Sequence, residues 1–91
     1  MFNFEEITKE YPYAKPVHAS CKGQIIWQYD LDDVSTAPFE GDKIEENAIL
    51  CYIQSYYGIE AVRVGYSGTI VATYKKQGEL VQKGEILAFI R

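Results

Sequence analysis

The chain is short, rich in aromatic residues and weakly acidic. It has 91 residues, of which 47% are hydrophobic and 14% aromatic, and a formal net charge of −4 at pH 7. This length suits one domain with a modest core, and the hydrophobic content is too high for a disordered chain. The acidic balance argues against a nucleic-acid-binding surface and against a basic membrane patch, because both need clustered Lys and Arg.

Cysteine usage and hydropathy indicate a soluble protein from a reducing compartment. Cys21 and Cys51 are far apart in sequence and form no C-x-x-C motif. Since no apolar secretory core precedes them, we expect two reduced thiols in a cytoplasmic protein. No run of about 18 apolar residues exists, so no segment is expected to span a membrane.

Residues 1–16 differ in pattern from the rest and are expected to form a lead-in segment or linker. Phe4 and Ile7 lie at helical spacing. Pro12 would end such a helix. We therefore expect a short helical or extended lead, followed by one domain over residues 17–91.

From residue 17 onward, short apolar stretches alternate with glycines, a pattern typical of strands and turns. No second helix fits between them, which excludes folds built from βαβ units. The expected strands are residues 17–21, 24–28, 48–53, 59–65, 69–74 and 85–90. The sequence therefore predicts an all-β domain.

The most informative feature is an internal repeat. Residues 41–53, GDKIEENAILCYI, align without gaps with residues 78–90, GELVQKGEILAFI. Asn47 aligns with Gly84, and both residue types tolerate a left-handed backbone at a turn. The repeat therefore extends to turn positions as well as to apolar ones.

A second, shorter pair precedes each copy, because GQII begins at Gly23 and GTIV begins at Gly68. Two strand–turn–strand units of this size cannot bury a face alone, but they can when packed about a pseudo-twofold axis. The sequence therefore predicts a flattened barrel or sandwich of two small antiparallel sheets. The first copy carries extra residues, at about 29–39, that the second lacks.

With this repeat, the chain resembles the biotinyl/lipoyl attachment domain family. Residues 41–44, GDKI, match the start of the first half of the family pattern, and residues 67–71, SGTIV, match the opening of the second. Residues 77–90 match its close, so the resemblance covers about 17–90. It implies a barrel-sandwich hybrid in which a hairpin between the halves presents a lysine that carries biotin or lipoate.

By this resemblance, the acceptor position falls on a tyrosine. Biotin carriers read Glu-Ala-Met-Lys-Met in the hairpin, and counting from both flanking glycine motifs places Tyr57 at the lysine, between Tyr56 and Gly58. Both cofactors are attached as stable amides, which requires a primary amine, whereas a phenol of pKa about 10 would give only a labile aryl ester. The nearest downstream lysines, Lys75 and Lys76, lie a whole strand away, so we expect no cofactor unless an atypical lysine is modified.

The extra residues at about 29–39 resemble, in place and length, the thumb of biotin carriers of the acetyl-CoA carboxylase type. Asp30, Asp32 and Asp33 lie among them, but the stretch lacks the glycine and the distal glutamate of a calcium loop, so no metal site is expected. His18 has no nearby nucleophile and is expected to be structural. No catalytic residue is expected in this chain.

The resemblance implies a non-catalytic docking or structural module of a biotin-dependent carboxylase or decarboxylase, with protein partners. Exposed Tyr is enriched at interfaces, so the hairpin tyrosines Tyr52, Tyr56 and Tyr57, with Tyr66, are the candidate recognition surface. Alternatively, Tyr56 and Tyr57 pack across the hairpin or over the thumb-like stretch. A genuine carrier modified at an atypical lysine stays open. A scaffold like that of membrane-fusion-type adaptors ranks last, because the chain has no coiled-coil hairpin between its halves.

Overall fold

The computed structural model describes residues 4–27 and 40–91 of the chain. Within them, one short helix, α1 (Phe4–Glu10), precedes the strands. The strands are β1 (Lys15–His18), β2 (Gly23–Ile26), β3 (Lys43–Ile44), β4 (Ile49–Ser55), β5 (Gly58–Arg63), β6 (Gly68–Thr73), β7 (Leu80–Val81) and β8 (Ile86–Ile90).

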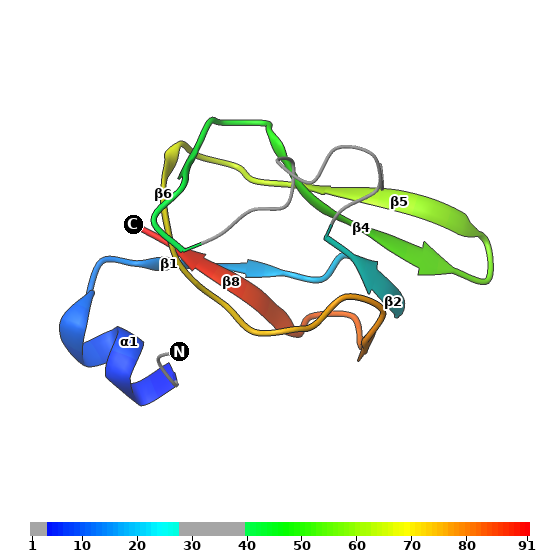
Figure 1. The fold of residues 1–91 in the computed structure, drawn as a ribbon, viewed down its shortest axis with the longest axis horizontal. Helices are drawn as coiled ribbons and strands as arrows, with labels where there is room; N and C mark the ends of the chain where they lie inside the picture. Colours follow the sequence, from blue (N-terminus) through cyan, green and yellow to red (C-terminus); the bar gives the residue numbers. More distant parts are fainter. Residues whose placement is uncertain (1–3, 28–39) are drawn as a thin grey trace.

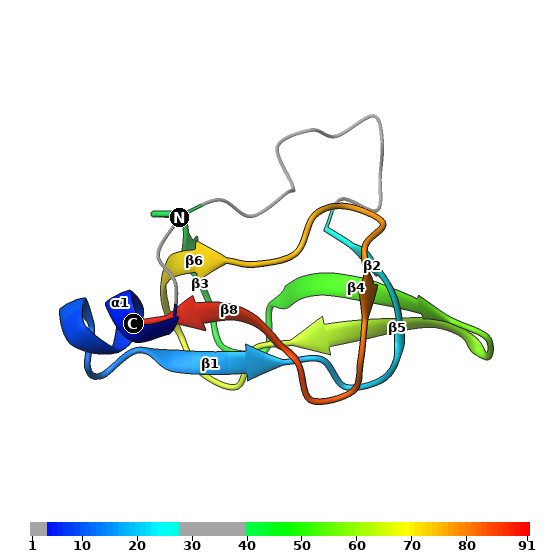
Figure 2. The ribbon, with the colours of Figure 1, turned by 90° about the horizontal axis from the view of Figure 1, so that it is seen from below.

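The strands form two four-stranded antiparallel sheets, in the orders β1-β8-β6-β3 and β5-β4-β2-β7. The ribbon shows the two layers and the β4–β5 hairpin that extends beyond them (Figure 1, Figure 2). The predicted all-β sandwich is confirmed. β3 and β7 were not expected, because two residues are too few to show the alternation by which a strand is recognised.

The two sheets are built from equivalent strands, so the predicted pseudo-twofold symmetry is present. The Asn47 N–H donates to the Val64 carbonyl, and the Gly84 N–H donates to the Ala19 carbonyl, both at 2.9 Å. Asn47 and Gly84 have φ of 68° and 90°, the left-handed region that the aligned Asn and Gly predicted. The repeat in the sequence is therefore a repeat of backbone conformation and hydrogen bonding.

Each half has one glycine at a place where two backbone segments pack very closely. A Cβ at Gly23 would collide with the carbonyl oxygen of Gln54, and a Cβ at Gly68 would collide with that of Arg91. The two pairs hold equivalent positions in the repeat. Glycine is required at both places because only a residue without a Cβ lets the neighbouring backbone come this close.

Side chains from both sheets meet in one main core between the layers. Its buried members are Val17, Ala19, Ile25, Ile44, Leu50, Cys51, Ile53, Val62, Val64, Ile70, Val81, Leu87, Ala88 and Ile90. Burying an aliphatic side chain of this kind contributes about 1.5–3 kcal/mol, so the core is the main source of stability.

α1 packs on the face of its sheet that points away from the main core. Ile7 is 1% exposed and packs with Val71, Ala72 and Phe89 in a second hydrophobic cluster. Phe89 lies between the core residues Ala88 and Ile90, which places it on the outer face, and a register shift in β6 brings both Val71 and Ala72 to the same side. The predicted helical lead is therefore part of the packed structure.

Two expectations on domain organisation are not settled by this fold. The boundary between residues 1–16 and 17–91 stays a prediction, and β1, which begins at Lys15, runs across it. The thumb-like insertion at about 29–39, with its three aspartates, lies outside the described residues.

Candidate functional site

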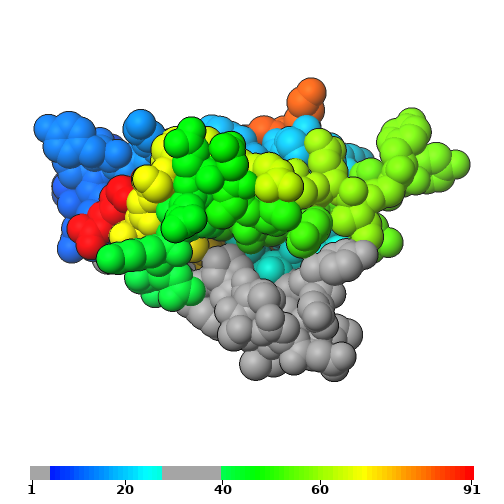
Figure 3. Space-filling view, turned by 90° about the horizontal axis from the view of Figure 1, so that it is seen from above, coloured from blue at the N-terminus to red at the C-terminus, as the bar shows by residue number. Residues whose placement is uncertain are grey.

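The β4–β5 hairpin carries the residues that the sequence singled out. Ser55 pairs with Gly58, so Tyr56 and Tyr57 form a two-residue turn at the tip. The Tyr57 N–H donates to Ser55 Oγ at 3.1 Å, and Gly58 has a φ of 131° that side-chain-bearing residues rarely adopt. The tip stands out from the body of the domain in the space-filling view (Figure 3). The turn thus presents two adjacent rings on a short, hydrogen-bonded support.

The two rings touch each other and almost nothing else. Tyr56 is 96% exposed and Tyr57 is 94% exposed, and their centroids lie 5.3 Å apart in an edge-to-face arrangement. The alternative in which both rings pack across the hairpin is therefore wrong, and packing over the thumb-like stretch falls on residues outside the described ranges. The physical reason is that the hairpin carries them beyond the two sheets, where no other described element lies against the two rings (Figure 2, Figure 3).

The structure does not bring the other two candidate tyrosines to the tip. Tyr52 is half-buried in the middle of β4. Tyr66 Oη donates to the Pro16 carbonyl at 3.2 Å, and Lys15 Nζ lies 4.9 Å from the centroid of the Tyr66 ring. Burial raises the pKa of the Tyr66 phenol. The exposed aromatic surface of the hairpin is therefore limited to Tyr56 and Tyr57.

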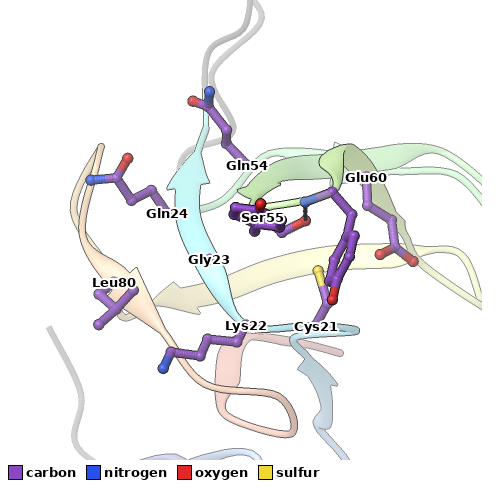
Figure 4. Close-up of a pocket in the computed structure, with 10 residues that line it drawn as sticks. Cys21, Lys22, Gly23, Gln24, Gln54, Ser55, Glu60 and Leu80 are labelled. Carbon is purple, nitrogen blue, oxygen red and sulfur yellow. Dashed lines mark hydrogen bonds between the residues drawn. The ribbon is translucent and has the colours of Figure 1, made fainter.

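A groove of about 580 Å³ runs along one side of the hairpin. Figure 4 shows that one wall comes from the hairpin and the other from the connection into β2, from the start of β2 and from Leu80 of β7. Cys21, Lys22, Ser55, Tyr57 and Glu60 are among the residues that line it. Sequence reasoning missed this groove. A signal existed, because extending the GQII and GTIV alignment upstream places the small Cys21 opposite the large Tyr66.

The groove holds a carboxylate and a protonated thiol. Partial burial, followed by a hydrogen bond to Glu60, raises the pKa of the Cys21 thiol. Burial raises the pKa of Cys51 in the core to about 12. Neither cysteine is in a disulfide. Because the thiolate is the reactive form, neither group is set up as a nucleophile.

The remaining polar candidates are held in structural contacts. His18 Nδ1 lies 2.9 Å from the Gly84 carbonyl oxygen. The described ranges contain no group of three or more His, Cys, Asp or Glu that could hold a metal ion. No helix in the described part of the chain is long and apolar enough to cross a membrane.

Lysines lie away from the hairpin tip. Residues 44–74, which include the whole hairpin, contain no lysine. Lys75 Nζ pairs with Glu85 Oε2 at 2.7 Å, and this contact raises the pKa of Lys75 and lowers that of Glu85. Lys22 lines the groove but lies on the connection between β1 and β2 rather than on a protruding turn.

Comparisons with known proteins identify a fold. No family model matches the sequence, and no curated protein matches it. The chain is similar to the urea carboxylase of Kluyveromyces lactis, with a TM-score of 0.69 and 19% identity over 86% of this chain and 6% of that chain. It is also similar to a single-chain, multi-domain long-chain acyl-CoA carboxylase, with a TM-score of 0.70 and 20% identity over 89% of this chain and 7% of that chain. The chain thus spans a small fraction of either carboxylase.

Proposed function

We propose that this chain is a biotin-carrier-like domain without an attachment lysine, which acts as a non-catalytic docking or structural module of a carboxylase or decarboxylase system. The observation that carries this proposal is the tip of the β4–β5 hairpin. Tyr56 and Tyr57 fill the two-residue turn where the family resemblance places the acceptor. The fold likeness to small parts of two carboxylases supports the enzyme context.

The hairpin lacks the nucleophile of an attachment site, and Tyr56 and Gly58 stand where a biotin carrier has its two flanking methionines. A ligase that makes an amide needs an exposed primary amine, and Tyr57 offers an exposed phenol at 94% accessibility. No lysine side chain can take its place from within the hairpin, because residues 44–74 contain none. The domain would then keep the shape by which a carrier docks, without delivering a prosthetic group.

The same proposal covers location and partners. We place the protein in the cytoplasm, with carboxylase or decarboxylase subunits as its protein partners. The unpaired thiols Cys21 and Cys51 support a reducing compartment. The protonated Cys21 and the absence of a metal cluster in the described ranges give no support to catalysis by this chain.

Intact-mass measurement after co-expression with a biotin ligase tests the proposal. We expect the unmodified chain to keep its calculated mass and Tyr57→Lys to gain one biotin. The matched control is Tyr56→Lys, which offers an equally exposed amine one residue away and should stay unmodified if Tyr57 holds the acceptor position. Equal labelling of both variants would show that the position is wrong.

The alternative function is decided by the same experiment. A biotin-sized increment on the unmodified chain would overturn the proposal. Peptide mapping to Lys22, Lys75 or Lys76 would then establish a genuine carrier with an atypical attachment site.

A further inference from the structure

The repeat makes the edge strands β1 and β5 equivalent, but the two strands differ in the backbone groups that their outer edges expose. β1 pairs with β8, and β5 pairs with the equivalent strand β4. Pro16 lies opposite Phe89, and Ala61 lies opposite Tyr52, the residue that aligns with Phe89 in the repeat. Pro16 and Ala61 therefore hold the same position, and only Ala61 has a backbone N–H.

The backbone N–H and C=O of Ala61 point to the outside of the sheet. Val64, three residues on, exchanges backbone hydrogen bonds with Asn47 and Ala48 on the inner side. Since bonding alternates along a strand, the groups of Ile59 and Ala61 point the other way. No strand in the described part of the chain pairs with this side of β5.

At β1 the corresponding edge is blocked by side chains. The Pro16 carbonyl accepts the hydrogen bond of Tyr66 Oη, whose ring also covers Lys15. In the other half, Cys21 stands in place of Tyr66 and Glu60 stands in place of Lys15. The groove beside the hairpin therefore includes the place that the Tyr66 ring fills in the other half.

β5 is also the least protected edge in the described sheets. β3 and β7 are only two residues long, and β1 carries a lysine and a proline. β5 has six residues with neither of those types. Short length, Lys and Pro are three of the devices that keep an edge strand from pairing, and β5 has none of them, so its edge is guarded only by the charges of Glu60 and Arg63.

We propose that β5 is a docking edge for an extended segment of a partner protein, with a basic residue opposite Glu60 and apolar residues on either side of it. Such a segment would add a fifth strand to the sheet through the backbone groups of Ile59 and Ala61. Glu60 faces the groove with an exposed carboxylate, and Ile59, 46% exposed, faces the other side. This inference names the partner chemistry of the proposed docking role and rests on that role.

A second copy of the chain does not fit this edge. A twofold antiparallel pairing about Ala61 would place Glu60 opposite the buried Val62 of the other copy, and a pairing about Val62 would place it opposite the buried Val64. A pairing about Glu60 would set two carboxylates against each other, which is destabilising. An inward-pointing charge on an edge strand is itself a device against self-pairing. Glu60 therefore selects for a partner with a basic residue.

Titration of the isotope-labelled full chain with two synthetic peptides tests the proposal by NMR. The probes are acetylated and amidated Thr-Thr-Thr-Val-Lys-Val-Thr-Thr-Thr and the same peptide with Glu at the centre. Their symmetric sequences read the same in parallel and antiparallel pairing. At millimolar concentration we expect the Lys peptide to shift the Ile59 and Ala61 amide signals and to bind about fivefold more tightly than the Glu peptide.

Three variants separate the contribution of the backbone hydrogen bonds from that of the Glu60 charge. In Ala61→Pro and Glu60→Lys, the new residue is the one that the equivalent position of the other half already carries. Ala61→Pro removes the outward N–H and should abolish binding of both peptides, whereas the control Ala61→Ser keeps the N–H and should bind as the unmodified chain does. Glu60→Lys should reverse the peptide preference. Equal binding of the two peptides, binding that survives Ala61→Pro, shifts confined to β7, or concentration-dependent dimerisation through β5 would each overturn the proposal.

The two proposals fail separately. A chain that gains biotin from the ligase yet binds the Lys peptide at β5 would overturn the proposed function and keep this inference. A chain that stays unmodified and shows no peptide preference would keep the proposed function and overturn this inference.

Discussion

The β4–β5 pair and the β8–β1 pair follow the same backbone path in the two halves of the domain, but only the first pair is joined by a turn. Ile53 and Ile90 hold the same place on the inner strands and are 0% and 1% exposed. At the edge, the first half carries exposed tyrosines and an open groove, while the second carries Pro16 and the ring of Tyr66. The interior is therefore duplicated and the edges have diverged.

One pair of edge side chains shows how far the duplication is kept. Arg63 Nη1 donates to the Asn47 carbonyl at 2.8 Å, and His18 Nδ1 lies 2.9 Å from the Gly84 carbonyl. The two side chains differ in type, yet each contacts the carbonyl of the left-handed residue in the turn of its own half. A position that serves the fold keeps its contact even when the two halves carry different residues there. An edge position whose contact is found in only one half is therefore the better place to look for function.

The largest expected effect comes from the two close-packed glycines. Gly23→Ala and Gly68→Ala should each lower the free energy of unfolding by about 3 kcal/mol, because the new methyl group meets a backbone carbonyl that cannot move aside. Urea denaturation measures the loss of stability in both variants. If the halves are equivalent, the two losses agree within about 1 kcal/mol, which is smaller than either loss. Gly65→Ala is the control, since nothing lies within 4 Å of its Cβ, and it should cost nothing.

The next largest effect tests the element that has no counterpart in the other half. Ile7→Ala should lower the free energy of unfolding by about 2 kcal/mol, because the side chain is 1% exposed and packs on the sheet with Phe89. The control is Lys9→Ala on the exposed side of the same helix. Equal urea midpoints for the two variants would show that α1 adds nothing to the domain.

The repeat made most of the fold predictable from the sequence. Strand alternation, the match of Asn47 with Gly84 and the paired glycines at Gly23 and Gly68 each carry a backbone requirement that a sequence displays directly. β3 and β7 could not be found, because a two-residue strand has no period. The burial of Ile7 could not be found either, since one apolar residue on a short helix does not say which face it meets.

The candidate site was predictable only in part. Counting placed Tyr56 and Tyr57 at the hairpin, but their exposure depends on how far the hairpin extends past the sandwich. The contrast between Pro16 and Ala61 is not visible in the linear repeat. β5 directly follows β4, its partner strand, whereas β1 comes at the start of the chain, far from its partner β8. Only the strand register makes the two positions equivalent.

A smaller effect is expected at the left-handed turns. Gly84→Ala should cost about 1–2 kcal/mol, because a new Cβ at positive φ approaches the backbone, and Asn47→Ala should cost about 1 kcal/mol, because alanine lacks the short polar side chain that favours the left-handed conformation. Gly84→Asn should cost less than Gly84→Ala, since the equivalent turn already uses Asn. Thermal unfolding of the three variants checks the order, and a larger loss for Gly84→Asn would mean that the two turns are not equivalent.

The smallest effect appears only at high pH, at the position where the first half has Cys51 and the second has Ala88. Burial raises the pKa of Cys51 from 9.0 to about 12. The protonated thiol therefore contributes stability that is complete below pH 9 and is lost as the pH rises towards 12, because the unfolded chain releases its proton first. By pH 10 this loss should reach about 1 kcal/mol.

Cys51→Ala isolates that contribution, since it gives the first half the residue that the second half has. We expect the variant to be less stable than the unmodified chain at pH 7 and to close that gap by about 1 kcal/mol at pH 10, as measured by urea denaturation at each pH. Other groups that titrate in this window, Cys21 among them, are the same in both proteins and cancel in the difference. A gap that stays constant between pH 7 and pH 10 would mean that the Cys51 thiol ionises as readily in the folded chain as in the unfolded one.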